Sequence, residues 1–299
     1  MSDRLQQLAV FVRTVETGSF SRAAREFGLT QPSASRAVAA LEDRLGVKLI
    51  ARTTRRISLT DPGEALLERL RDALAAVEDA ENAARGADQL TGVLRVALPP
   101  TYGARRIAPL LPAFLEKQPL LKVDLMMADR YEDLIAEGAD LALRLGEQPD
   151  SSFVTRRLES ARRLFIAAPA YLARWGEPKG LADLSRLDMI MGQAALDEQT
   201  WIARRNGAPE MMRVEARIRA SSASGVVACA AAGLGVAVAS IWMCAEELAS
   251  GALREILTDY SLDPIPVFIV FPAGRRPSQK ARIFAEYLEQ AVARPPRQA

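Results

Sequence analysis

The side chains best suited to chemistry lie close together near the N-terminus, between residues 30 and 36. They are Thr30, Gln31, Ser33, Ser35 and Arg36. Glutamine can pair bidentately with adenine and arginine with guanine, while serine adapts to several base edges. Arg36 could equally contact only a phosphate. The chemistry that this set offers is hydrogen bonding to a nucleic-acid duplex.

A helix over residues 31–45 is expected to position these side chains. Thr30 suits the N-cap, Pro32 falls in the first turn, where a missing N–H costs nothing, and Gly46 suits the C-cap. The apolar stripe of this helix consists of Ala34, Val38, Leu41 and Leu45. Glu42 is expected to fall off the stripe, as the polar residues of the first turns do. Exposed N–H groups at such a helix N-terminus suit phosphate.

A second, shorter helix is expected just before, over residues 21–27. Ser19 or Ser21 caps it, alanines at 23 and 24 allow a close crossing, and Gly28 closes it. Two small-residue helices joined by a glycine-bearing turn are typical of a helix-turn-helix. An ordinary helical hairpin explains the pair alone equally well, because short helix-turn-helix patterns give many false matches.

The residues after Gly46 favour DNA binding over the ordinary hairpin. Residues 47–52 and 56–60 are short β-prone segments around an arginine-bearing tip, and they predict a two-stranded wing. Residues 1–60 carry ten Lys or Arg against five Asp or Glu, an excess that the formal net charge of +2 conceals. A basic wing beside a polar helix end predicts a winged helix-turn-helix.

Composition excludes several kinds of chemistry. The 299 residues include no histidine and only two cysteines, Cys229 and Cys244, each in an apolar segment. Catalysis through histidine, histidine-ligated metals and a four-thiolate zinc site are therefore excluded, and free thiols are expected. No glycine-rich phosphate loop or paired-carboxylate motif is present. We expect no enzymatic activity and no cofactor.

No apolar run in the chain approaches the ~20 residues that a membrane span needs. The N-terminus, MSDRLQQ, does not resemble a signal peptide. We expect a cytoplasmic protein without membrane contact.

A long helix is expected over residues 61–85, with Thr60 or Asp61 as its cap. Its apolar stripe contains Leu66, Leu70, Ala73, Leu74, Val77, Ala80 and Ala84. Residues 61–90 carry eight acidic side chains against three arginines, so this helix is not expected to lie on DNA. Pairing with the same helix of a second copy would bury the stripe, and we favour it over packing on the chain's own neighbouring domain.

From residue 93 onward, short apolar strands alternate with helices. We expect strands at 93–98, 123–127, 141–145, 164–168, 189–191, 213–219, 235–239 and 266–271. The expected helices are 104–117, 131–137, 169–175, 223–232 and 278–292. Such alternation predicts an α/β domain with a mostly parallel sheet covered by helices on both faces.

The whole chain resembles the LysR-type transcriptional regulators. The resemblance rests on GSFSRAA at 18–24, TQPSASR at 30–36, LGVKL at 45–49 and RTTR at 52–55. It implies an all-α winged helix-turn-helix (1–60), a linker and dimerisation helix (61–90) and a two-lobed α/β effector domain like periplasmic binding proteins (91–299). Lobe 1 is expected at about 91–160 and 265–299, and lobe 2 at about 161–264.

The resemblance also implies the function and the DNA-binding residues. A homodimer or homotetramer would bind an inverted repeat in double-stranded promoter DNA, with RNA polymerase as a further candidate partner. The implied base-reading residues are Gln31, Pro32, Ser35 and Arg36, with Ser33 beside them. The implied phosphate contacts are Ser21, Arg22, Thr30 and Arg52, and the wing with Thr53 and Arg55 would lie over the minor groove.

An effector site is expected where three loops meet at the carboxyl ends of strands. Its candidate residues are Pro100, Thr101, Tyr102, Arg144, Gln193, Ser222 and Ser224. Two helix N-termini with hydroxyls, together with Arg144, favour a small anionic effector, expected to be a carboxylate. The hydroxyls could instead be ordinary N-caps and Arg144 a surface arginine. A small-molecule-binding protein without a transcriptional role is the alternative, and it accounts for the cleft alone.

Overall fold

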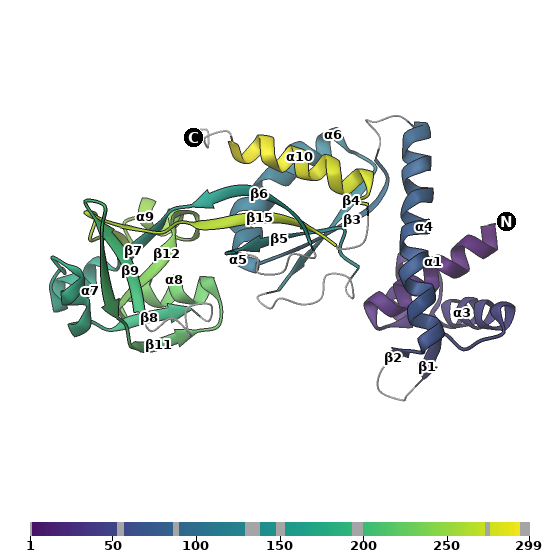
Figure 1. The fold of residues 1–299 in the computed structure, drawn as a ribbon, viewed down its shortest axis with the longest axis horizontal. Coiled ribbons are helices and arrows are strands. Elements are labelled where there is room, and N and C mark those ends of the chain that lie inside the picture. The colour runs from purple at the N-terminus through teal and green to yellow at the C-terminus, as the bar shows by residue number, and fades with distance from the viewer. Residues whose placement is uncertain are drawn as a thin grey trace.

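The computed structural model describes residues 2–52, 57–85, 90–128, 138–147, 153–192, 200–272 and 276–293. The chain forms a helical head (residues 2–59), a long helix α4 and a two-lobed α/β domain, arranged in that order along the molecule (Figure 1). No helix in these described ranges is long and apolar enough to cross a membrane.

The head consists of three helices and a hairpin. They are α1 (Ser2–Thr17), α2 (Phe20–Glu26), α3 (Gln31–Leu45), β1 (Ile50–Arg52) and β2 (Ile57–Leu59). Phe11, Val38 and Leu41 are at most 1% exposed and form the centre of its core. The head is thus built on the apolar stripes of α1 and α3, as their periodicity predicts.

The ends of α3 confirm the prediction. Thr30 Oγ1 accepts the N–H of Ser33, and Gly46 takes the left-handed conformation (φ +71°) and donates its N–H to the Glu42 carbonyl. For α2, the cap is Ser19, whose hydroxyl accepts the N–H of Arg22. The stripe ends earlier than expected, because Leu45 is 41% exposed.

The prediction that Glu42 lies on the solvent side of α3 is wrong, since this residue is only 5% exposed. Its Oε1 accepts the N–H groups of Leu49 (2.9 Å) and Ile50 (3.1 Å), and its Oε2 accepts Lys48 Nζ (2.7 Å). The helical pattern could not reveal this burial, because the chain leading into β1 folds back over this face of α3.

The linker helix α4 (Asp61–Arg85) starts where the sequence predicts. Thr60 Oγ1 accepts the N–H of Gly63 and donates to the Lys48 carbonyl, which ties the helix start to the wing. Leu67 and Leu70 pack into the head core, whereas Val77 is 38% exposed. The first half of the stripe is therefore covered by the chain's own head.

Lobe 1 is built on a five-stranded sheet in the order β4-β3-β5-β15-β6. The strands are β3 (Gly92–Leu98), β4 (Leu121–Met127), β5 (Leu141–Leu145), β6 (Val154–Ala161) and β15 (Ile265–Phe271). β3 runs parallel to β4 and β5, while β15 is antiparallel to β5 and β6. α6 (Leu111–Lys117) and α10 (Gln279–Ala293) meet through Phe114 and Phe284, with ring centroids 4.9 Å apart.

The helix expected at 104–117 begins earlier, as α5 (Pro100–Tyr102), and passes through a π turn (Gly103–Ile107) and a 3-10 turn (Ala108–Leu110) into α6. The helix expected at 131–137 lies outside the described residues. Edge strand β6 was not predicted, because its sequence, VTRRLESA, is mostly polar and solvent-exposed.

Lobe 2 is built on a second five-stranded sheet, in the order β11-β8-β12-β7-β13. Its strands are β7 (Arg163–Ala167), β8 (Met189–Gly192), β11 (Ala216–Ala220), β12 (Val236–Ser240) and β13 (Arg254–Ile256). The helices around it are α7 (Pro169–Trp175), α8 (Ala223–Ala231) and α9 (Ala245–Ala249), with 3-10 turns at Leu181–Arg186 and Ile241–Met243. Cys229 and Cys244 are free thiols, as predicted.

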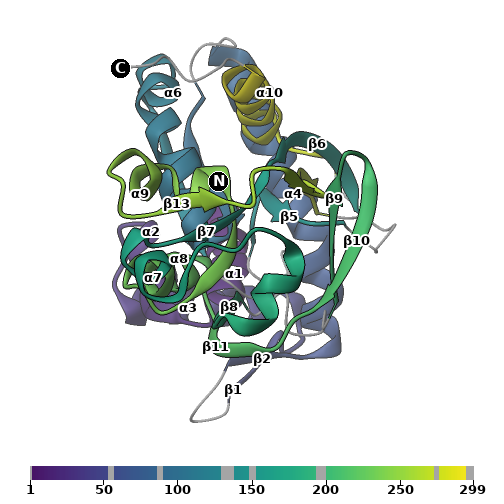
Figure 2. The ribbon, with the colours of Figure 1, turned by 90° about the vertical axis from the view of Figure 1, so that its left-hand side faces the viewer.

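A smaller sheet, β10-β9-β14, stands at the side of lobe 2 (Figure 2). It contains β9 (Thr200–Arg205), β10 (Ala208–Arg213) and β14 (Tyr260–Leu262). The strand expected at 213–219 is β11, but its start is wrong, because Arg213 ends β10 and β11 begins at Ala216. The hairpin escaped prediction since most of its side chains face solvent and it lacks a regular apolar alternation.

Candidate DNA interface and effector site

The polar side chains at the start of α3 are available to a ligand. Gln31, Pro32 and Arg36 are exposed, as is the cap Thr30, while Ser33 and Ser35 are half-buried. Arg36 Nη2 donates to Ser33 Oγ (3.3 Å), which in turn lies 2.9 Å from Thr30 Oγ1. A guanidinium has five N–H donors, so this bond orients Arg36 and leaves other donors available for a ligand.

Two further parts of the head complete the predicted DNA-binding set. Ser21 and Arg22 are exposed in the first turn of α2. β1 and β2 pair antiparallel, with Arg52 opposite Ile57, and so form the two-stranded wing that the sequence predicts. Thr53 and Arg55, which are expected from the sequence at the tip of the wing, lie outside the described residues.

Tyr102, a candidate effector residue, also joins the two lobes. It is fully buried, its hydroxyl donates to Glu159 Oε1 (2.7 Å), and its ring meets Trp242 edge-on at 5.0 Å between centroids. Burial is the main cause that raises the pKa of Tyr102, and the carboxylate of Glu159 raises it further, so the phenol stays protonated. Arg106 Nη2 also binds Glu159 (3.0 Å).

Buried polar atoms without partners lie on, or next to, the two segments that make this contact. In the described part of the chain, Thr101 Oγ1, Ser240 Oγ and Trp242 Nε1 are buried and have no hydrogen-bond partner. Thr101 and Trp242 belong to α5 and the 3-10 turn Ile241–Met243, which contact each other across the lobes. An unmet buried donor costs about 1–3 kcal/mol, so this junction is suited to a polar ligand.

The remaining effector candidates take ordinary positions in the fold. Pro100 opens α5 and is half-buried, and Arg144 is half-buried on β5, opposite Phe268 of β15. Ser222 caps α8 by accepting the N–H of Gly225 (3.1 Å), and the exposed Ser224 lies 3.3 Å from its hydroxyl. Gln193 lies outside the described residues.

Sequence reasoning missed the residues that hold the lobes together at this end. Arg105 donates from Nη1 and Nη2 to the two carboxylate oxygens of Glu247, both at 2.7 Å, and also to the Met243 carbonyl. The hydrogen bonds from Arg105 outweigh burial and lower the pKa of Glu247. No short-range signal could reveal such pairs, since their members lie more than a hundred residues apart.

A winged helix-turn-helix joined by a long helix to a two-lobed α/β domain defines a ligand-responsive, DNA-binding regulator. Residues 5–64 match the model of the bacterial regulatory helix-turn-helix protein, lysR family, and residues 87–293 match that of the LysR substrate binding domain. The chain belongs to the LysR family of transcriptional regulators.

Individual relatives resemble the chain over almost its whole length. An uncharacterized HTH-type transcriptional regulator of Haemophilus influenzae is 31% identical over 274 residues, which cover 91% of this chain and 95% of the relative. The structure of CrgA from Neisseria meningitidis has a TM-score of 0.62 at 30% identity, covering 96% of this chain and 98% of that one. Full-length AphB of Vibrio cholerae has a TM-score of 0.59 at 26% identity, covering 95% and 98%. These relatives are DNA-binding transcriptional regulators and not enzymes, and both matched domains are domains of such regulators.

Proposed function

We propose that this regulator reads an inverted-repeat promoter site through the first turns of α3 and responds to a small anionic effector between its lobes. One observation carries the DNA-reading part: exposed Gln31 and Arg36 project from a helix start that Thr30 caps, beside a two-stranded wing. A small-molecule-binding protein without a transcriptional role does not account for this head.

Each exposed residue of the head receives a role from its chemistry. Gln31, Ser35 and Arg36 contact base edges together with Pro32, and Ser33 orients Arg36. The phosphate contacts are Ser21, Arg22, Thr30 and Arg52, with Thr53 and Arg55 over the minor groove. If Arg36 contacts only a phosphate, it does not select guanine at the base pair that it faces.

The effector is proposed to be a carboxylate. Trp242 Nε1 can only donate, and Thr101 and Ser240 can each donate a hydroxyl proton, so the unmet atoms at the lobe junction fit a ligand rich in acceptors. Pro100, Tyr102, Arg144, Gln193, Ser222 and Ser224 complete the proposed site.

The proposed active form is a homodimer or homotetramer, in the cytoplasm. An inverted repeat needs two heads related by a two-fold axis. The outer half of the α4 stripe supports this, because Val77 is 38% exposed and Ala80 and Ala84 are exposed on the same helix. RNA polymerase is the proposed partner of the DNA-bound form.

A mobility-shift assay on the DNA upstream of the chain's own reading frame tests the proposal. We expect salt-sensitive binding that is selective against random duplex, and absence of any shift at low salt would overturn it. A thermal-shift screen of small carboxylates tests the effector class, since a ligand that binds only the folded state raises its melting temperature.

A further inference from the structure

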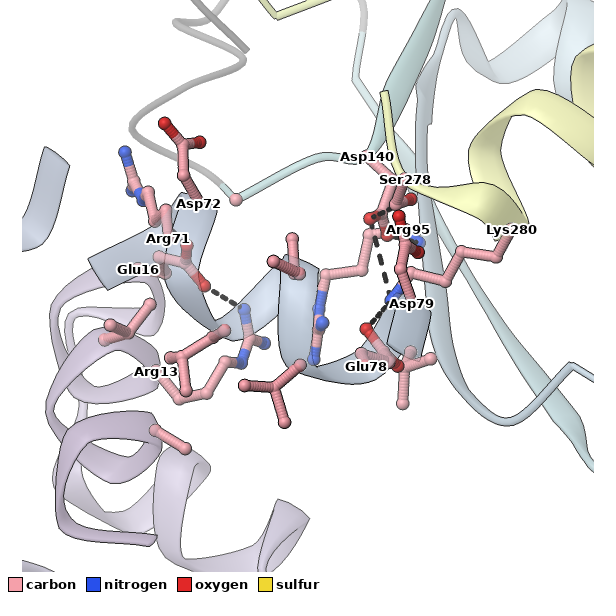
Figure 3. Close-up of a pocket in the computed structure, with 18 of the residues that line it drawn as sticks. Arg13, Glu16, Arg71, Asp72, Glu78, Asp79, Arg95, Asp140, Ser278 and Lys280 are labelled. Atoms are coloured by element: carbon pink, nitrogen blue, oxygen red, sulfur yellow. Dashed lines mark hydrogen bonds and ion pairs between the residues drawn. The ribbon is translucent and has the colours of Figure 1, made fainter. Parts of the chain in front are cut away.

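A cleft of about 750 Å³ lies where the head, α4 and lobe 1 meet (Figure 3). Arg13 and Glu16 line it from α1 on the head side, and Arg95 and Lys280 line it from lobe 1, with α4 crossing between them. Ionic contacts span this junction and connect the DNA-binding head to the regulatory domain of the same chain.

The central contact is made by Glu26, at the end of α2. Its Oε2 accepts Arg95 Nη2 from β3 at 2.7 Å, and its two oxygens accept Nε and Nη2 of Arg13 at 2.7 and 2.6 Å. Burial alone would raise the pKa of Glu26, but hydrogen bonds and charge attraction from Arg13 and Arg95 outweigh it and lower the pKa. Glu26 is therefore a carboxylate held between the head and lobe 1.

The contact continues through the head into α4. Glu16 Oε2 accepts Arg13 Nη1 at 2.6 Å, and Glu16 Oε1 accepts Arg71 Nε at 3.0 Å. The side chains of Arg71, Glu16, Arg13 and Arg95 are 6%, 7%, 11% and 13% exposed, whereas Glu26 is 33% exposed. Solvent therefore screens the two Glu16 pairs far less than surface pairs, and it screens the two Glu26 pairs to an intermediate degree. We call the series Arg71–Glu16–Arg13–Glu26–Arg95 the junction network.

Arg95 is firmly held on the lobe 1 side. Its backbone N–H donates to Asp140 Oδ2 (2.8 Å), and its carbonyl accepts the Asp140 N–H (2.9 Å). Gly138 packs against Glu16 so closely that a Cβ on it would lie 2.4 Å from Glu16 Cδ. Two independent contacts from lobe 1 therefore meet the head.

We propose that Arg95 is a positioning residue for α3: through Glu26 it fixes the helix-turn-helix of its own chain in one orientation relative to lobe 1. This inference rests on the proposed DNA-reading role of α3. β3 ends at Leu98 and leads directly into Pro100 and Thr101 of the proposed effector site, so a shift there reaches Arg95 along a single strand. The same strand thus links the proposed effector site to head orientation.

The test compares Arg95→Gln, Arg95→Lys and Glu26→Gln in the full chain. Without DNA, hydrogen exchange of the α2 backbone should rise about five-fold or more in Arg95→Gln, while the lobe 1 core stays unchanged. Arg95→Lys keeps a positive charge for the single bond to Glu26 and should restore part of the protection. Glu26→Gln also weakens the bonds from Arg13, so it should have the larger single effect. The double variant Arg95→Gln/Glu26→Gln should exceed Glu26→Gln by little, since both changes remove the Arg95–Glu26 contact.

A second readout is specific to positioning. With the head released, the preference between operators whose half-sites lie ~10 and ~15 base pairs apart should fall about three-fold or more. The matched control is Arg162→Gln, which breaks the exposed Arg162–Glu255 pair within lobe 2. If the Arg95→Gln variant shows the same hydrogen exchange of α2 and the same preference between operator spacings as the Arg162→Gln variant, the proposal is overturned. Because hydrogen exchange is measured without DNA, it tests the positioning role of Arg95 even if the proposed DNA binding of the wild-type chain is not observed.

Discussion

Glu42 on α3 accepts the backbone N–H of Leu49 at 2.9 Å, so the helix that carries the proposed base-reading residues also holds the segment leading into the wing. The same carboxylate oxygen accepts Ile50 N–H, and the other accepts Lys48 Nζ. The orientation of the wing relative to α3 is thus fixed by a buried carboxylate, not by packing alone.

Glu42→Gln should destabilise the head by about 1–3 kcal/mol, because it removes a charged acceptor from two buried N–H groups and leaves Lys48 unpaired. Urea denaturation followed by circular dichroism measures this. The neighbouring Asp43→Asn is the control, since Asp43 is exposed, and it should change stability by no more than about 0.5 kcal/mol. Equal stability of the two variants would contradict the role of Glu42.

Acid stability should depend on the same carboxylate. Burial alone would raise the pKa of Glu42, but hydrogen bonds from Lys48, Leu49 and Ile50 outweigh it and hold the pKa below the usual 4.5. A lowered folded-state pKa gives stability that is present above pH 4.5 and is lost as pH falls through the folded-state value. We expect the urea midpoint to fall less between pH 5 and about pH 3 in Glu42→Gln than in the wild type. Parallel pH profiles would refute this.

Local signals sufficed where an element is defined by its own residues. Thr30, Pro32 and Gly46 predicted both ends of α3, because caps and first-turn prolines act within a few positions. The family resemblance likewise predicted the two-lobed α/β fold. The domain boundaries at residues 60 and 90 and the roles of individual site residues stay predictions.

Contacts between distant residues could not be predicted in this way. Tyr102 contacts Trp242 across the two lobes, and Glu26 contacts Arg95 between the head and lobe 1. Both pairings depend on how the folded head and lobes pack against one another. One signal existed for the second contact, a single arginine within the apolar stretch 93–98. A buried charge in such a strand calls for a partner, although its identity depends on the tertiary structure.

Gly63→Ala should loosen the junction of α4 and the wing. A Cβ on Gly63 would lie 2.1 Å from the Leu49 carbonyl oxygen, so one of the two backbones must move. We expect a loss of about 1–3 kcal/mol, even though alanine is the better helix former. Thermal unfolding measures it, with the adjacent Glu64→Ala, which is exposed, as the control that should be nearly neutral.

Gln31→Ala and Arg22→Ala should separate base reading from phosphate contact. Gln31→Ala should lower the affinity for the operator relative to random DNA by about 1–3 kcal/mol. Arg22→Ala should weaken binding to both duplexes alike and reduce the salt slope by about 1. Fluorescence anisotropy over a salt series measures both quantities. Equal losses on operator and random DNA for Gln31→Ala would exclude a base contact.

Thr101→Val should uncouple effector binding from stability. The Thr101 hydroxyl is buried without a hydrogen-bond partner in the described structure, so replacing it with a methyl group of similar size should leave the ligand-free protein equally stable or raise its melting temperature. If the hydroxyl donates to a carboxylate effector, the same change should reduce the ligand-induced thermal shift, with affinity lower by about 1–3 kcal/mol. Thr155→Val on β6, where the side chain is exposed, is the control and should keep the full shift. A variant that loses stability without ligand but keeps the shift would place the Thr101 hydroxyl outside the effector site.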